Sequence, residues 1–203
     1  MKLISLGGIG GCDLAESLRS LHQEAYPYDW LITTQTFIIN SFNDFNKFFV
    51  FDTSYIYNET NLLTVDKKAI MLHDFKNFTI ERNDVVEKYR RRFERLKTAL
   101  YSNDTILFVR IYDNLEESLA PANYYDTILV RDIEDIQRWE EFIVHIQTTF
   151  MNTNIKLLLI TSNKDICSVL YPNIIIYFTK DHKSSKAITT IIQDTIQHLT
   201  TTA

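Results

Sequence analysis

Short apolar runs alternate with segments of helical periodicity from residue 104 to the end of the chain. Four runs are mostly apolar, with apolar residues in succession rather than at every second position: residues 105–111, 125–130, 155–160 and 173–178. Continuous apolar strands are typical of a parallel sheet that helices cover on both faces. The sequence therefore predicts an α/β fold with a mostly parallel sheet, and we expect all 203 residues to form a single domain.

The first half of the chain is less regular. Residues 2–6 are apolar enough for a buried strand, and residues 13–21 have the periodicity of a helix in which Asp13 and Glu16 have the spacing of a capping box. Further helices are expected at residues 34–49 and 83–101. Between these two helices, short segments with strand character predict a small irregular or antiparallel annex around residues 50–80.

All four glycines of the chain lie within five positions, at Gly7, Gly8, Gly10 and Gly11. Glycine permits positive φ and close approach of a backbone to a ligand. The glycine loop follows the predicted first strand, and ligands of open parallel sheets bind beyond the carboxyl ends of the strands. We therefore expect a site at this loop, with Gly8, Gly10 and Gly11 as ligand-binding residues.

Neither nucleotide-binding fingerprint fits the glycine loop. No lysine follows the last glycine, as a phosphate loop requires, and Asp13 stands where the dinucleotide motif has its third glycine. A carboxylate at that position would repel a pyrophosphate. The spacing favours a loop that positions the start of the following helix over a phosphate cradle.

Cys12 stands at the predicted helix start, where the helix dipole favours a thiolate. Asp13 and Glu16 oppose that effect, so a nucleophilic Cys12 would need a base. His73 follows an apolar run and precedes Asp74, which suits a histidine base with a carboxylate nearby. The alternative is a small buried cysteine, with a histidine that bonds the backbone at a strand end.

Three further groups of residues have one structural and one functional interpretation each. Trp30 and Asp29 belong to an aromatic segment that forms either a packed corner or the wall of a pocket. Arg110 ends a strand and Glu116 and Glu117 follow it, so these residues either bind substrate or pair with one another at the surface. The basic residues around positions 88–97 form either a phosphate-binding patch or a solvated helix face, and i to i+4 acid–base spacing favours the solvated face.

Composition excludes several classes of protein. The net charge of −5 argues against a nucleic-acid binder and against a polybasic membrane anchor. No apolar run reaches the roughly 18 residues that a membrane span needs. Two cysteines do not make a disulfide framework, so we expect a cytoplasmic protein. No cluster of metal ligands is present in the sequence, and we expect neither a metal nor another cofactor.

Several motifs together resemble a family of putative papain-like cysteine peptidases. They are Ser5-Leu-Gly7, Cys12-x-x-Ala15-x-x-Leu18-Arg19, Pro27-Tyr-Asp-Trp30, His73-Asp74-Phe75, Tyr89-Arg-Arg-Arg92 and Leu107-Phe-Val-Arg110. The resemblance covers about residues 3–120 and continues loosely to the end. The chain differs from the family pattern by two extra residues between Gly7 and Cys12, and by Tyr28 in place of Phe.

The resemblance implies Cys12 as nucleophile, His73 as base, and Asp74 or Asp29 as the carboxylate that orients the base. It also implies a papain-like fold, whereas the periodicity of residues 104–200 predicts a parallel α/β sheet, which we follow. The leading hypothesis is a cysteine-dependent, peptidase-like hydrolase of a peptide or small-molecule substrate, with loop N–H groups around Gly10 holding the oxyanion.

Two alternative functions remain open from the sequence, so enzyme activity itself is not decided. One is a non-catalytic interaction protein that binds a protein partner. The other is a transferase or hydrolase that binds a phosphate or sugar ligand at the glycine loop, assisted by Arg110 and by Glu116 or Glu117. No hypothesis includes a nucleic acid or a membrane as partner.

Overall fold

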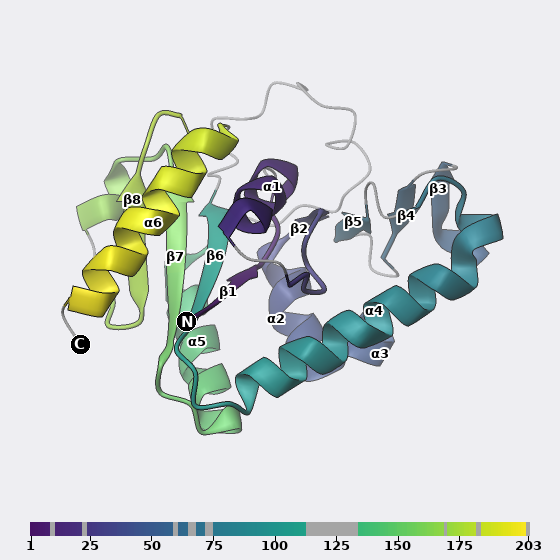
Figure 1. Cartoon of the computed structure of the whole chain (residues 1–203), viewed down its shortest axis with the longest axis horizontal. Helices are drawn as coiled ribbons and strands as arrows, with labels where there is room; N and C mark the ends of the chain where they lie inside the picture. The colour runs from purple at the N-terminus through teal and green to yellow at the C-terminus, as the bar shows by residue number, and fades with distance from the viewer. Residues whose placement is uncertain are drawn as a thin grey trace.

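The structure is a computed structural model, and it contains two sheets (Figure 1). It describes residues 1–8, 11–21, 24–58, 61–64, 68–71, 75–112, 134–168, 170–181 and 184–201. Within these residues, one four-stranded sheet has the order β1-β6-β7-β8, and a second four-stranded sheet has the order β2-β5-β4-β3. The prediction of a mixed α/β fold is confirmed.

The first sheet is parallel throughout. Its strands are β1 (Lys2–Ser5), β6 (Ile106–Tyr112), β7 (Ile155–Thr161) and β8 (Ile174–Phe178). In the register, Ile4 lies opposite Phe108, and Phe108 lies opposite Leu157. Every residue of β6 is buried, which explains why its sequence is apolar throughout apart from Arg110 and ends in Tyr112.

Helices cover both faces of the parallel sheet, as the sequence predicts. On one face, α1 (Gly11–Leu21) and α6 (Ser185–Thr201) pack Leu14 and Ile188 against Leu107 and Val109 of β6. On the other face, α5 (Ile136–Phe150) contributes to the core cluster that contains Phe108. Alternate residues of β6 therefore belong to two separate apolar cores. A short 3₁₀ helix, η3 (Asp165–Ser168), connects β7 and β8.

The second sheet is antiparallel and forms the expected annex. Its strands are β2 (Leu31–Thr33), β5 (Ala69–Met71), β4 (Asn61–Leu63) and β3 (Ile56–Asn58), with the 3₁₀ helix η1 (Thr53–Tyr55) before β3. The prediction of an annex at residues 50–80 omitted β2. This strand has only three residues between a proline turn and a helix, which is too short for its periodicity to be recognised.

The remaining helices are α2 (Gln35–Asn43), α3 (Phe45–Phe48) and α4 (Phe78–Leu100). The helix expected at residues 34–49 is split, because the Asp44 side chain accepts a hydrogen bond from the Lys47 backbone and starts a new helix there. Helix α4 begins at Phe78 rather than near residue 83, because Asn77 caps it by accepting from the Ile80 N–H.

Two further expectations differ from the structure or lie beyond it. The capping box at Asp13 and Glu16 is wrong, since α1 begins at Gly11 and Asp13 is within its first turn. The apolar run at residues 125–130 is outside the described residues. Among the helices that the structure describes, none combines the length and the apolar character that crossing a membrane requires.

Candidate active site

The glycine loop lies where the ends of β1 and β6 meet β2 of the other sheet. Gly7 and Gly8 have positive φ values of 68° and 119°. A Cβ atom on Gly7 would stand 2.8 Å from the Leu31 carbonyl oxygen, and one on Gly8 would stand 2.9 Å from the Ile111 carbonyl oxygen. Gly11 is closer still, at 2.2 Å from the Leu31 carbonyl oxygen. These distances leave no room for a side chain at any of the three positions.

The described glycines therefore face protein backbone rather than open space. Their positions are explained by the close packing of the loop between two sheets, so they give no support to a phosphate or sugar cradle. The Gly11 N–H also donates to the Gly8 carbonyl oxygen at 3.0 Å, which occupies that donor. Gly10 is outside the described residues. Ligand binding by Gly8, Gly10 and Gly11 stays a prediction.

Cys12 is the second residue of α1 and carries a free, partly buried thiol. Burial, and secondly the charge of Asp13, raise the pKa of the Cys12 thiol above its ordinary value. Glu16 is directed elsewhere, since it accepts a hydrogen bond from Ser185 on α6 at 3.1 Å. Both effects disfavour the thiolate, so a nucleophilic Cys12 needs a base, as the sequence suggested.

His73 and Asp74, the predicted base and its carboxylate, are outside the described residues. The strand that leads to them is described. Met71 ends β5 and lies opposite Leu31 of β2 in the antiparallel register. Leu31 in turn contacts Gly11, the residue before Cys12. Strand β2 thus lies between the end of β5 and the start of α1.

Asp29 and Trp30 form both the corner and the pocket wall that the sequence offered as alternatives. The buried Asp29 carboxylate accepts from the Tyr26 N–H at 3.0 Å, and the Asp29 N–H donates to the Tyr26 carbonyl oxygen at 3.3 Å. Trp30 has a φ of 67°, which is unusual for a bulky residue. Both residues also line a cavity of about 270 Å³ beside α1. A role for Asp29 in orienting a histidine stays a prediction.

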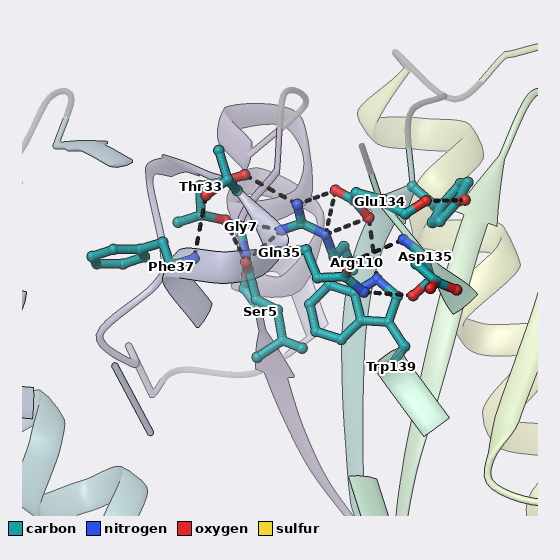
Figure 2. A network of polar contacts seen from close by, with 12 residues as sticks. Ser5, Gly7, Thr33, Gln35, Phe37, Arg110, Glu134, Asp135 and Trp139 are labelled. Carbon is teal, nitrogen blue, oxygen red and sulfur yellow. Dashed lines mark hydrogen bonds and ion pairs between the residues drawn. The ribbon is translucent and has the colours of Figure 1, made fainter. Parts of the chain in front are cut away.

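Arg110 is buried beneath the glycine loop and has all five N–H groups engaged by protein oxygens (Figure 2). Its guanidinium donates to the Leu6 carbonyl oxygen at 3.0 Å, to the Thr33 hydroxyl at 2.9 Å and to the Thr33 carbonyl oxygen at 3.0 Å. The remaining N–H groups pair with the Glu134 carboxylate, and the group lies 5.1 Å from the centre of the Trp139 ring.

This geometry corrects both interpretations of Arg110. A guanidinium with every donor used inside the protein has none for a ligand, and the ion pair is buried rather than at the surface. Glu116 and Glu117, the predicted acidic partners, are outside the described residues. The sequence analysis did not identify Glu134 as the partner of Arg110. Acidic residues are common just before a helix, and Glu134 stands next to Asp135, directly before α5.

Next to the Arg110 network, the start of α5 is joined to the start of α2, the helix that follows β2. The Gln35 side-chain amide donates to the Asp135 carbonyl oxygen at 2.6 Å and accepts from the Asp135 N–H at 2.9 Å. The Tyr112 hydroxyl donates to the Glu134 carbonyl oxygen at 2.9 Å, and burial followed by the charge of Glu134 raises the pKa of Tyr112 to about 12. Together with the bonds from Arg110 of β6 to Thr33 of β2, these contacts fix the two sheets to each other beneath the glycine loop.

Arg92 departs from the expectation of a solvated basic helix. Arg90 and Arg91 are exposed, but Arg92 is only 9% exposed and lies over the Tyr89 ring, at 5.1 Å from its centre. It lines the same cavity as Trp30. The signal was present in the sequence, because Arg92 is three residues after Tyr89 and four before Leu96 on the buried stripe of the helix.

Comparisons with known proteins give one match. A family model described as "Putative papain-like cysteine peptidase" matches residues 1–163. No curated protein and no solved structure matches the chain. Over the described part of the chain, no group of three or more histidine, cysteine, aspartate or glutamate residues could hold a metal ion.

Proposed function

Because the chain belongs to the family of putative papain-like cysteine peptidases, we propose that it is a cysteine-dependent hydrolase with Cys12 as its nucleophile. The observation that carries the proposal is the position of Cys12, a free and partly exposed thiol at the start of α1, next to the carboxyl end of a strand of the parallel sheet. Ligands of open parallel sheets bind at that edge.

The proposed reaction proceeds in two steps. The Cys12 sulfur attacks the carbonyl carbon of a peptide bond, and a base takes the thiol proton and passes it to the leaving amine. Water then hydrolyses the thioester, which releases the acid and returns the proton to the thiol. Burial and the charge of Asp13 raise the pKa of Cys12, so the attack depends on a base that takes the thiol proton.

We assign the base to His73, with Asp74 or Asp29 as the carboxylate that orients it. The support is the register of the antiparallel sheet. Met71, at the end of β5, pairs with Leu31, and Leu31 contacts the residue next to Cys12. β5 therefore ends beside the strand that contacts the start of α1, and the proposed base is the histidine that follows β5 in the sequence.

The oxyanion donors follow from the same helix start. The Gly11 N–H is engaged by Gly8, whereas the Cys12 N–H belongs to the first helical turn, where backbone N–H groups have no acceptor within the helix. We therefore propose the Cys12 backbone N–H as one oxyanion donor, with Gly10 as the neighbouring candidate.

A peptidyl chloromethyl ketone tests the assignment, because it alkylates an activated thiol and leaves a mass increase that can be mapped. We expect labelling of the wild-type protein and of Cys167→Ala, and none of Cys12→Ala. His73→Ala should slow the labelling by about 100-fold or more, the usual effect of losing a general base. Equal labelling of Cys12→Ala, or an unchanged rate in His73→Ala, would contradict the proposal.

Peptide hydrolysis is the second readout. The wild-type protein, Cys12→Ala and Cys167→Ala are each incubated with a mixture of peptides of known sequence, and new termini are identified by mass spectrometry. Products that form with the wild-type protein and Cys167→Ala but not with Cys12→Ala support the hydrolase. Labelled protein that yields no product from any peptide counts against peptides as the substrate class.

A further inference from the structure

The cavity beside α1 is lined by residues from three separate parts of the chain. Ala15 and Arg19 come from α1, Arg92 comes from α4, and Glu24, Asp29 and Trp30 come from the segment that leads into β2. Its volume of about 270 Å³ is slightly below the roughly 300–1,000 Å³ of pockets for drug-sized ligands. The cavity therefore suits one small group, such as a single amino-acid side chain.

Two residues that line the cavity lie on the same face of α1 as Cys12. Cys12, Ala15 and Arg19 are spaced i, i+3 and i+7, which places them on one side of α1. Cβ atoms three residues apart on a helix are separated by about 5–6 Å. A substrate whose scissile bond reaches the Cys12 sulfur thus has a neighbouring residue within reach of this cavity.

Cations dominate the surroundings of the cavity. Arg19 and Arg92 line it, and the Arg95 guanidinium donates to the carbonyl oxygen of Ala25 in its wall. Two carboxylates, Glu24 and Asp29, are also present.

Both carboxylates already accept donors from neighbouring residues. Glu24 accepts from the Lys2 ammonium at 3.5 Å and from the Tyr26 hydroxyl at 3.0 Å, and Asp29 accepts from the Tyr26 N–H at 3.0 Å. With Arg95 and Lys2 beside the cavity, four cations in and around it therefore face two carboxylates.

Trp30 gives the cavity an unusual wall. Its φ of 67° places an aromatic residue in the left-handed region, where steric strain costs on the order of 1–3 kcal/mol. The turn that holds it is closed by the hydrogen bond from the Leu31 N–H to the Tyr28 carbonyl oxygen at 3.2 Å. Strained residues that the surrounding structure maintains are concentrated at ligand sites.

We propose that this cavity binds the carboxylate of an acidic side chain in the substrate, so that the proposed hydrolase acts next to aspartate or glutamate. The inference rests on the proposed function and adds a substrate class to it. Arg19 supplies an exposed guanidinium that matches the planar, bidentate geometry of a carboxylate, and Arg92 adds positive charge to the buried wall. A phosphate fits less well, because its second negative charge would be repelled by Glu24 and Asp29.

A fluorescence titration of Cys12→Ser tests the site without any reaction. The chain has two tryptophans, and Trp139 is fully buried in the core, so a ligand in the cavity changes the emission of Trp30. We expect N-acetyl-glutamate to bind about tenfold more tightly than N-acetyl-glutamine, which has the same shape without the charge. Inorganic phosphate should bind more weakly than N-acetyl-glutamate.

Variants then locate the interaction. Arg19→Gln, at an exposed position, should weaken N-acetyl-glutamate binding about tenfold, whereas Arg91→Gln, exposed on the neighbouring turn of α4, should leave it unchanged. Equal affinity for the two N-acetyl amino acids, tighter binding of phosphate, or equal losses in both variants would overturn the proposal. Because the titration needs no nucleophile, failed labelling of Cys12 would reject the hydrolase and leave this binding result standing.

Discussion

Arg110 and Arg92 are both buried arginines, but their guanidinium groups lie in very different surroundings. Arg110 sits beneath the glycine loop with five N–H groups bound to Leu6, Thr33 and Glu134. Arg92 lies against one aromatic ring and forms part of the wall of a cavity. The first arrangement fixes two sheets together, whereas the second lies at the wall of a cavity.

The comparison distinguishes an arginine that holds the fold together from an arginine that lines a cavity. An arginine whose donors are all satisfied internally is a structural connection, whatever its position at a strand end suggests. From the sequence, Arg110 either binds substrate or pairs with acidic residues at the surface, and Arg92 lies on a solvated helix face. Burial and partners, rather than residue type, distinguish the two roles.

The largest expected effect is on the free energy of unfolding, when the ion pair between Arg110 and Glu134 is broken. Arg110→Met leaves Glu134 buried without its cation, and removing one partner of a buried pair typically costs about 3–5 kcal/mol. Urea denaturation followed by circular dichroism measures the change in unfolding free energy. The double variant Arg110→Met/Glu134→Leu should recover much of the loss, because no charge is then left unpaired.

Arg92→Met is the matched comparison in the same assay. We expect it to cost about 1 kcal/mol, since it removes packing against Tyr89 and one wall of the cavity. Arg90→Met, whose partner Glu87 is exposed, serves as a control and should leave the denaturation midpoint unchanged. A loss for Arg92→Met as large as that for Arg110→Met would remove the distinction between the two arginines.

The second prediction concerns the loop that lies above Arg110. Replacing a helical glycine by alanine normally stabilises a helix by about 1 kcal/mol. At Gly11 the added Cβ would stand 2.2 Å from the Leu31 carbonyl oxygen, so Gly11→Ala should instead destabilise the protein by about 1–3 kcal/mol.

The test of this prediction again uses urea denaturation, with Ser20→Ala as the control. Ser20 is exposed near the other end of α1, where alanine has no backbone to collide with and should have little effect on stability. If Gly11→Ala stabilised the protein, the close packing of α1 against β2 would be wrong. The close packing near the glycine loop would then be limited to the Arg110 network.

The fold was largely predictable because its signals are local and repeated. Apolar runs such as that of β6 are long enough to identify a parallel sheet, and the stripe that includes Ile38 and Phe42 identifies a core helix. β2 could not be found in this way, since its three residues are held by pairing with β5 and not by their own periodicity. The split at Asp44 depends on a single side-chain cap.

The site was less predictable because it depends on residues far apart in the chain. The glycine loop was recognised as unusual, and its position at the end of β1 is confirmed. Its purpose was not evident, since the atoms that exclude a Cβ belong to residues 31 and 111. The partnership of Arg110 with Glu134 spans 24 residues, and no local pattern marks it.

The smallest expected effect is on the reactivity of Cys12, which lies on α1, the helix beside the cavity that Arg92 lines. It comes from the charge of Asp13, the residue after Cys12. Asp13, next to the thiol, adds to burial in raising its pKa. Asp13→Asn should therefore lower the pKa and increase the thiolate fraction at pH 7.5, speeding alkylation by iodoacetamide by about threefold. The rate is measured by mass spectrometry in a Cys167→Ala background, with Asp84→Asn on α4 as the exposed control.

The pH dependence of the alkylation rate tests the direction of the Cys12 pKa shift without any variant of Asp13. Because burial and the charge of Asp13 raise the pKa of Cys12 above its ordinary range, the alkylation rate should rise about tenfold per pH unit through the neutral range without levelling off. A plateau below pH 8 would mean that Cys12 is already paired with a base in the free protein. Proton removal would then precede attack, and Asp13 would matter less than the partner that holds the thiolate.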